Sequence, residues 1–140
     1  MPQNYQTEAD ANLGRLALNP YPGRGLILGL DHQAENLIQV YWIMGRSKNS
    51  RNRVFEEKRR STISTEPADP AKVQDPSLII YDAMDERLYV YVVSNGHQTK
   101  WFLERGGNLC DTFVAWSGRS YEPDAPNYTP RIIGVHHLKS

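Results

Sequence analysis

The chain has 140 residues, and its 16 basic and 16 acidic side chains balance to a formal net charge of zero. Hydrophobic residues make up 39% and charged residues 23%, which is typical of a globular rather than a disordered protein. The sequence contains no apolar run long enough for a membrane helix and no signal-peptide pattern, so we expect one cytoplasmic domain over residues 1–140. The single cysteine, Cys110, cannot form an intrachain disulfide and is expected to be a small buried residue.

The first half of the chain predicts a short helix followed by a β-hairpin. The helix is expected at 8–16, before a turn-rich segment with two prolines and two glycines. Two strands are expected at 26–30 and 37–44, joined by a polar connection. The second strand is rich in Tyr, Trp, Val and Ile, and its nearly continuous apolar character predicts burial on both faces.

The second half predicts another hairpin and then helices. Strands at 78–81 and 88–94 flank a charged connection at 82–87, and both faces of the second strand are apolar. The other expected elements are strands at 62–65 and 132–135 and helices at 99–105 and 108–117, the helices being separated by Gly106 and Gly107. Because strands come first and helices later, we predict an α+β fold with antiparallel sheets.

Residues 46–60 concentrate positive charge, with seven basic side chains against two acidic ones. Arginine forks match phosphate oxygens, and backbone N–H groups in Gly, Ser and Asn turns can add further donors. The alternative interpretation is a solvated basic loop. Because the rest of the chain is not basic, a compact phosphorylated molecule fits better than nucleic acid. We expect no metal site, since the adjacent His136 and His137 would point to opposite faces of a strand.

Five sequence blocks, in a fixed order, carry a resemblance to a known family. They are residues 19–25 (NPYPGRG), 41–47 (YWIMGRS) with 50–53 (SRNR), 93–96 (VSNG), 121–124 (YEPD) and 129–132 (TPRI). This ordered set resembles the archaeal type of the IMP cyclohydrolase family.

The resemblance implies a fold similar to the N-terminal nucleophile hydrolases, a four-layer α-β-β-α sandwich. It also implies closure of the purine ring: 5-formamidoimidazole-4-carboxamide ribotide loses water to give inosine monophosphate, with no cofactor. Family members are usually longer than this chain, so the resemblance implies a C-terminal truncation or a short variant that completes its core through a partner. An uncovered sheet edge favours association, and we expect a homo-oligomer.

The same resemblance assigns candidate site residues. Arg53, Tyr81 and Glu122 align with the family's catalytic arginine, tyrosine and glutamate, and the candidate substrate-binding residues are Arg46, Ser47, Asn95 and Arg131. These residue types fit the reaction. The 5′-phosphate needs cations, and the poorly nucleophilic carboxamide needs positioning and stabilisation of the charge on the formyl oxygen. An alternative function is a non-catalytic nucleotide- or RNA-binding module that uses residues 46–60, with Tyr41 and Trp42 as stacking surfaces.

Overall fold

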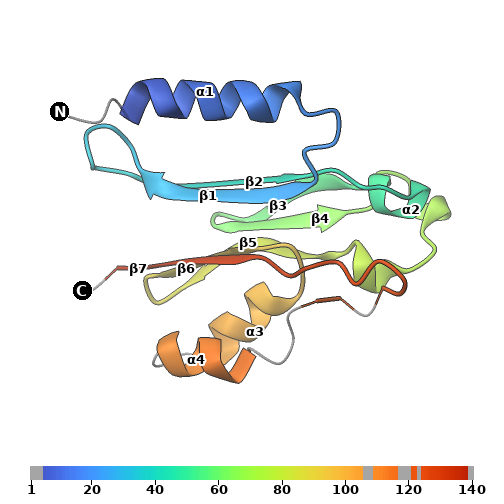
Figure 1. The fold of residues 1–140 in the computed structure, drawn as a ribbon. Coiled ribbons are helices and arrows are strands. Elements are labelled where there is room, and N and C mark those ends of the chain that lie inside the picture. Colours follow the sequence, from blue (N-terminus) through green and yellow to red (C-terminus); the bar gives the residue numbers. More distant parts are fainter. Residues whose placement is uncertain (1–4, 106–108, 117–120, 123, 139–140) are drawn as a thin grey trace.

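In the described part of the chain, four layers follow one another in the order helix, sheet, sheet, helices (Figure 1). The computed structural model describes residues 5–105, 109–116, 121–122 and 124–138. α1 (Tyr5–Leu18) lies over a two-stranded sheet, and α3 (Gln98–Arg105) and α4 (Leu109–Trp116) lie on the far face of a five-stranded sheet. The predicted α+β class with antiparallel sheets is therefore confirmed.

The small sheet is the predicted first hairpin. β1 (Arg24–Leu30) pairs with β2 (Leu37–Ile43) antiparallel, with Leu26 opposite Tyr41. The prediction that this second strand is buried on both faces is wrong. Tyr41 points inward and is buried, whereas Val40 on the outer face is 42% exposed. The reason is that α1 lies over this face without packing on it, since no residue of α1 is buried.

The large sheet has the strand order β3-β4-β5-β6-β7, and every neighbouring pair is antiparallel. Its strands are β3 (Val54–Arg59), β4 (Thr62–Glu66), β5 (Tyr81–Arg87), β6 (Val90–Ser94) and β7 (Ile133–His137). The strands predicted near 62–65, 88–94 and 132–135 correspond to β4, β6 and β7. β3 was not predicted, because its side chains are exposed throughout and four of its six residues are charged.

The prediction of a strand at 78–81 followed by a charged turn is wrong. Pro76–Leu78 forms a 3₁₀ helix, and the supposed turn is the body of β5. The carboxylates of this strand are compensated by β4, since Asp82 and Asp85 accept hydrogen bonds from hydroxyl groups on that strand at 2.6 Å. The true turn lies at Leu88 and Tyr89, both with positive φ, as tight hairpins require.

Two apolar clusters hold the layers together. Tyr41, Tyr81, Ala83 and Val93 form the cluster between the sheets, and Val92, Phe102, Leu103 and Trp116 form the cluster beneath the large sheet. Val92 and Val93 belong to different clusters, so the two apolar faces of β6 are both buried at this point. β7 approaches β1 closely at Gly134, where an added Cβ would lie 2.6 Å from Leu28 Cδ1.

The two predicted helices near the C-terminal end are confirmed as α3 and α4. The predicted break at Gly106 and Gly107 lies outside the described residues. Cys110 on α4 is exposed, which corrects the prediction of a buried thiol, because the core side of this helix is formed by Thr112 and Trp116 instead. Among the helices of the described ranges, none has the length and apolar character needed to cross a membrane.

Candidate functional site

A cavity of about 740 Å³ opens at the end of the sandwich where β1 begins and β2 ends. Its lining residues come from segments 21–24, 46–53 and 75–78, from Glu122 and from segment 124–132. These segments are far apart in the sequence and meet because the two sheets stack on each other. The volume is in the range of sites that hold small organic ligands.

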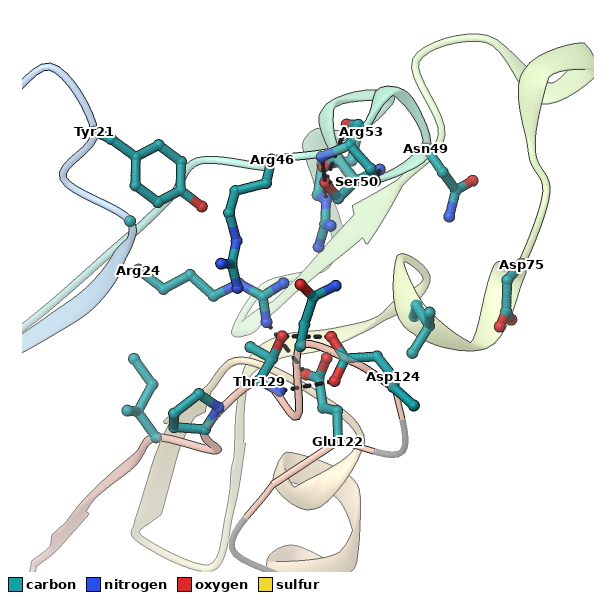
Figure 2. A pocket seen from close by; sticks show the side chains of 17 residues that line it. Tyr21, Arg24, Arg46, Asn49, Ser50, Arg53, Asp75, Glu122, Asp124 and Thr129 are labelled. Atoms are coloured by element: carbon teal, nitrogen blue, oxygen red, sulfur yellow. Dashed lines mark hydrogen bonds and ion pairs between the residues drawn. The ribbon is translucent and has the colours of Figure 1, made fainter.

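Charges of both signs line this cavity. They belong to Arg24, Arg46, Arg53, Asp75, Glu122 and Asp124. Figure 2 shows the three arginine side chains entering from the side of the small sheet and α2, and Glu122 and Asp124 facing them from the opposite side. A ligand in this space would therefore meet guanidinium donors on one side and carboxylate acceptors on the other.

The arginine-rich segment contains a one-turn helix, α2 (Lys48–Arg51), which was not predicted from the sequence. Ser47 caps this helix, accepting a hydrogen bond from the Ser50 backbone N–H, and the Ser50 side chain completes a capping box. Gly45 lets the chain fold back tightly, because an added Cβ would lie 2.3 Å from the Ser50 carbonyl carbon. The result is a fixed base from which Arg46 and Arg53 reach the cavity.

Arg53 is held by two contacts and has one donor group left over. Its Nε donates to the Ser50 carbonyl at 2.7 Å, and its Nη1 donates to the Tyr81 hydroxyl at 3.5 Å. Its Nη2 is buried and has no hydrogen-bond partner among the described residues. A buried donor left unpaired costs about 1–3 kcal/mol. A ligand oxygen that met this group would relieve that cost.

Tyr81 stands behind Arg53 and does not line the cavity. It is only 7% exposed, and its hydroxyl lies 2.9 Å from the Tyr41 hydroxyl. Burial, together with the neighbouring Tyr81, raises the pKa of Tyr41 far above its usual range, so Tyr41 keeps its proton. The structure thus brings the predicted Arg53 and Tyr81 together and adds a second phenol that the sequence had not suggested for this site.

Glu122 is the buried carboxylate of the site. Its Oε1 accepts a hydrogen bond from Arg24 Nη1 at 3.3 Å, and the two side chains are 8% and 16% exposed. Burial raises the pKa of Glu122, and the positive charges of Arg24 and Arg131 partly offset this effect. Arg24 was not predicted as a site residue. Its position inside the NPYPGRG block was the one signal that could have found it.

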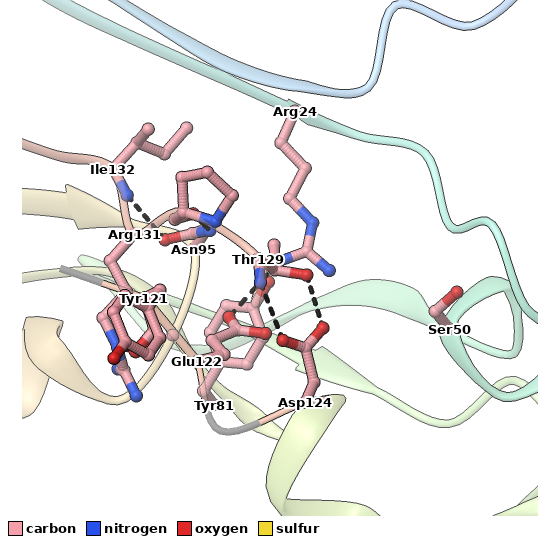
Figure 3. A network of polar contacts seen from close by, with 12 residues as sticks. Arg24, Ser50, Tyr81, Asn95, Tyr121, Glu122, Asp124, Thr129, Arg131 and Ile132 are labelled. Carbon is pink, nitrogen blue, oxygen red and sulfur yellow. Dashed lines mark hydrogen bonds and ion pairs between the residues drawn. The ribbon is translucent and has the colours of Figure 1, made fainter. Parts of the chain in front are cut away.

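The segment that carries Glu122 is fixed by its own turn (Figure 3). The Glu122 backbone N–H donates to the Thr129 carbonyl at 2.8 Å. Asp124 accepts hydrogen bonds from both the backbone N–H and the hydroxyl of Thr129. Burial opposes ionisation of Asp124, but these hydrogen bonds prevail and lower its pKa. Asp124 is therefore a second negative charge near Glu122. Its two hydrogen bonds also fix the conformation of the segment between Asp124 and Thr129.

Two of the predicted substrate-binding residues do not line the cavity. Asn95 is fully buried, donates to the Pro130 carbonyl at 2.9 Å and accepts from the Ile132 backbone N–H at 2.9 Å. Arg131 donates to the Tyr121 carbonyl at 3.1 Å. These contacts hold the segment whose neighbouring residues form one cavity wall. Arg46 and Ser47, by contrast, do line the cavity.

The basic segment 46–60 does not present a single cationic face. Lys58 pairs with Glu56 at 2.8 Å and with Glu66 at 3.0 Å. Tyr41, proposed as a stacking surface for RNA, is buried in the core between the sheets. Arg46 and Arg53 of this segment line the cavity and Lys58 and Arg59 form ion pairs on the sheet, which favours a small ligand over a nucleic-acid strand.

The model of a family described as IMP cyclohydrolase-like protein matches residues 21–140. No curated protein matches the chain. The matched range contains every residue that lines the cavity.

Proposed function

The chain belongs to the IMP cyclohydrolase-like family, and on that basis we propose that it closes the purine ring of 5-formamidoimidazole-4-carboxamide ribotide to form inosine monophosphate. The observation that carries the proposal is that Arg53, whose Nη2 is buried without a hydrogen-bond partner among the described residues, lines the same cavity as the buried carboxylate of Glu122. Ring closure needs a donor for an oxygen and an acceptor for a proton in one small space. This pair supplies both.

Substrate binding is assigned to the outer part of the cavity. Arg46 is exposed and carries a permanent charge, which suits the 5′-phosphate of the ribotide. Ser47 lines the same wall, although its hydroxyl also caps α2. Arg53 is better suited to a neutral carbonyl oxygen, because two of its three nitrogens are already engaged by the protein. We therefore assign the phosphate to Arg46 and the formyl oxygen to Arg53.

In the proposed reaction, the carboxamide nitrogen of the substrate attacks its own formyl carbon. A C–N bond forms, and negative charge develops on the formyl oxygen, where Arg53 stabilises it. One proton leaves the carboxamide nitrogen and one leaves the formamide nitrogen. Both end on the former formyl oxygen, which departs as water when its bond to carbon breaks.

Glu122 is the proposed proton carrier. It accepts the carboxamide proton and returns it to the departing hydroxyl group. Burial raises the pKa of Glu122 toward the pH at which the reaction runs, and a base is most effective near that point. In this proposal Tyr81 acts through Arg53, because its hydroxyl accepts a hydrogen bond from Arg53 Nη1 and so helps to hold the guanidinium that stabilises the formyl oxygen.

The test is absorbance-monitored cyclisation by the purified 140-residue chain. We expect turnover by the unchanged protein, loss of turnover in Glu122→Gln and normal turnover in Glu104→Gln, an exposed glutamate on α3. No turnover by the unchanged protein, combined with salt-resistant binding of the nucleotide, would assign a binding role instead. Binding of RNA that weakens steeply with salt would favour the nucleic-acid alternative.

Two further expectations belong to the same proposal: a homo-oligomeric state and a cytoplasmic location. Light scattering on the purified chain measures the first, and a single-chain mass would contradict it.

A further inference from the structure

We infer that Arg24 is a positioning residue, which keeps the Glu122 carboxylate ionised and directed into the cavity. This inference rests on the proposed function, in which Glu122 accepts a proton. It concerns a residue outside the set of catalytic and substrate-binding residues that the sequence assigned.

Arg24 and Glu122 come from different walls of the cavity and meet inside it. Arg24 begins β1 in the small sheet, whereas Glu122 lies 98 residues later, on the segment that follows α4. Figure 3 shows the Arg24 side chain extending from the strand toward the Glu122 loop. Their 3.3 Å contact therefore joins the small sheet to the segment that follows α4, and both side chains are largely shielded from water.

The backbone on both sides of Arg24 is firmly held, so the point from which its side chain extends is fixed. The Met44 backbone N–H donates to the Gly23 carbonyl at 2.8 Å. On the other side, Gly25 packs directly under the Trp42 ring, because an added Cβ would lie 2.0 Å from Trp42 Cζ2. The backbone at Arg24 is thus already ordered, and only the side-chain rotamers, at a cost of up to about 2 kcal/mol, remain to be fixed when the guanidinium contacts Glu122.

Two positive charges act on the Glu122 carboxylate, and the hydrogen bond to Glu122 comes from Arg24. Arg131 contributes a favourable charge but directs its Nε to the Tyr121 carbonyl, and Asp124 contributes an unfavourable one. Without Arg24, the Glu122 carboxylate would lie buried beside another negative charge. It would then hold its proton at a pH where it must accept one.

The kinetic test compares Arg24→Gln, Arg24→Lys and the control Arg87→Gln over a pH range. Arg87 is an exposed arginine at the far end of β5, six residues from Tyr81, or about 20 Å along the strand. We expect Arg24→Gln to lose about 10- to 100-fold in kcat/KM at neutral pH and to recover as the pH rises, because Glu122 then ionises without help. Arg24→Lys should retain most of the activity, and Arg87→Gln all of it. An equal loss at every pH would overturn the inference.

A second measurement does not depend on turnover. In protein with ¹³C-labelled glutamate, the Glu122 carboxyl signal is identified by its absence in Glu122→Gln, and its titration is followed in the unchanged protein and in Arg24→Gln. We expect the titration midpoint to lie at higher pH in Arg24→Gln, and an unchanged midpoint would overturn the inference. If the midpoint moves while the unchanged protein shows no turnover, the electrostatic role of Arg24 stands and the proposed function fails.

Discussion

Replacing Arg53 with lysine keeps the positive charge in the cavity and removes the planar guanidinium. In the structure, one nitrogen of Arg53 donates to the Ser50 carbonyl at 2.7 Å, another to the Tyr81 hydroxyl at 3.5 Å, and the third is buried without a partner. A lysine ammonium is a single point donor at the end of a flexible chain. It cannot hold Ser50 and at the same time present a fixed donor to a ligand oxygen.

The size of the effect follows from which contact is lost. Removing one preorganised donor to a developing oxyanion lowers kcat by about 10²–10³-fold. The substrate phosphate is assigned to Arg46, so we expect KM to change little. We therefore predict that Arg53→Lys lowers kcat by about 10²-fold or more through loss of transition-state stabilisation.

The assay is absorbance-monitored cyclisation, with Arg51→Lys as the matched control. Arg51 lies on α2 two residues away, is exposed, and donates from Nη2 to the Arg46 carbonyl at 3.2 Å. Thermal unfolding of both variants separates lost catalysis from lost folding. A kcat for Arg53→Lys within twofold of the unchanged protein would refute the reasoning, as would an equal loss in Arg51→Lys.

Three further predictions test the neighbouring groups and the packing. Tyr81→Phe should lower kcat by about tenfold with little change in KM, because it removes one hydrogen bond to the Arg53 guanidinium; unchanged kinetics would show that the hydroxyl does not contribute to catalysis. Burial raises the pKa of Glu122, so its ionisation costs native-state stability as pH rises through that pKa. Denaturant unfolding should therefore show Glu122→Gln gaining stability, relative to the unchanged protein, from pH 4 to pH 8, and a constant difference would contradict this. Gly134→Ala should destabilise by about 1–3 kcal/mol, because its Cβ would crowd Leu28. Gly29→Ala, with open space around the added Cβ, should be neutral or stabilising by about 0.5 kcal/mol. If Gly134→Ala and Gly29→Ala changed the free energy of unfolding equally, the close packing of β7 on β1 would be refuted.

The sequence by itself determined the elements whose signals are local. The apolar runs of β1, β2 and β6 and the helical spacing of α3 and α4 are readable because side-chain periodicity reflects the geometry of each element. The arginine-rich segment after β2 was also recognisable. Its Arg46 and Arg53 line the cavity, and a capping box makes residues 48–51 a one-turn helix.

The tertiary structure decided what depends on neighbours distant in the chain. β5 reads as a charged turn until Ser64 and Thr62 of β4 supply hydrogen bonds to its carboxylates. β2 reads as doubly buried, yet its outer face stays exposed because α1 does not pack on it. The site follows the same rule. Arg24 and Glu122 are 98 residues apart, and no local pattern encodes their pairing, because only the packing of the segment after α4 against the start of β1 brings their charges together, largely shielded from water.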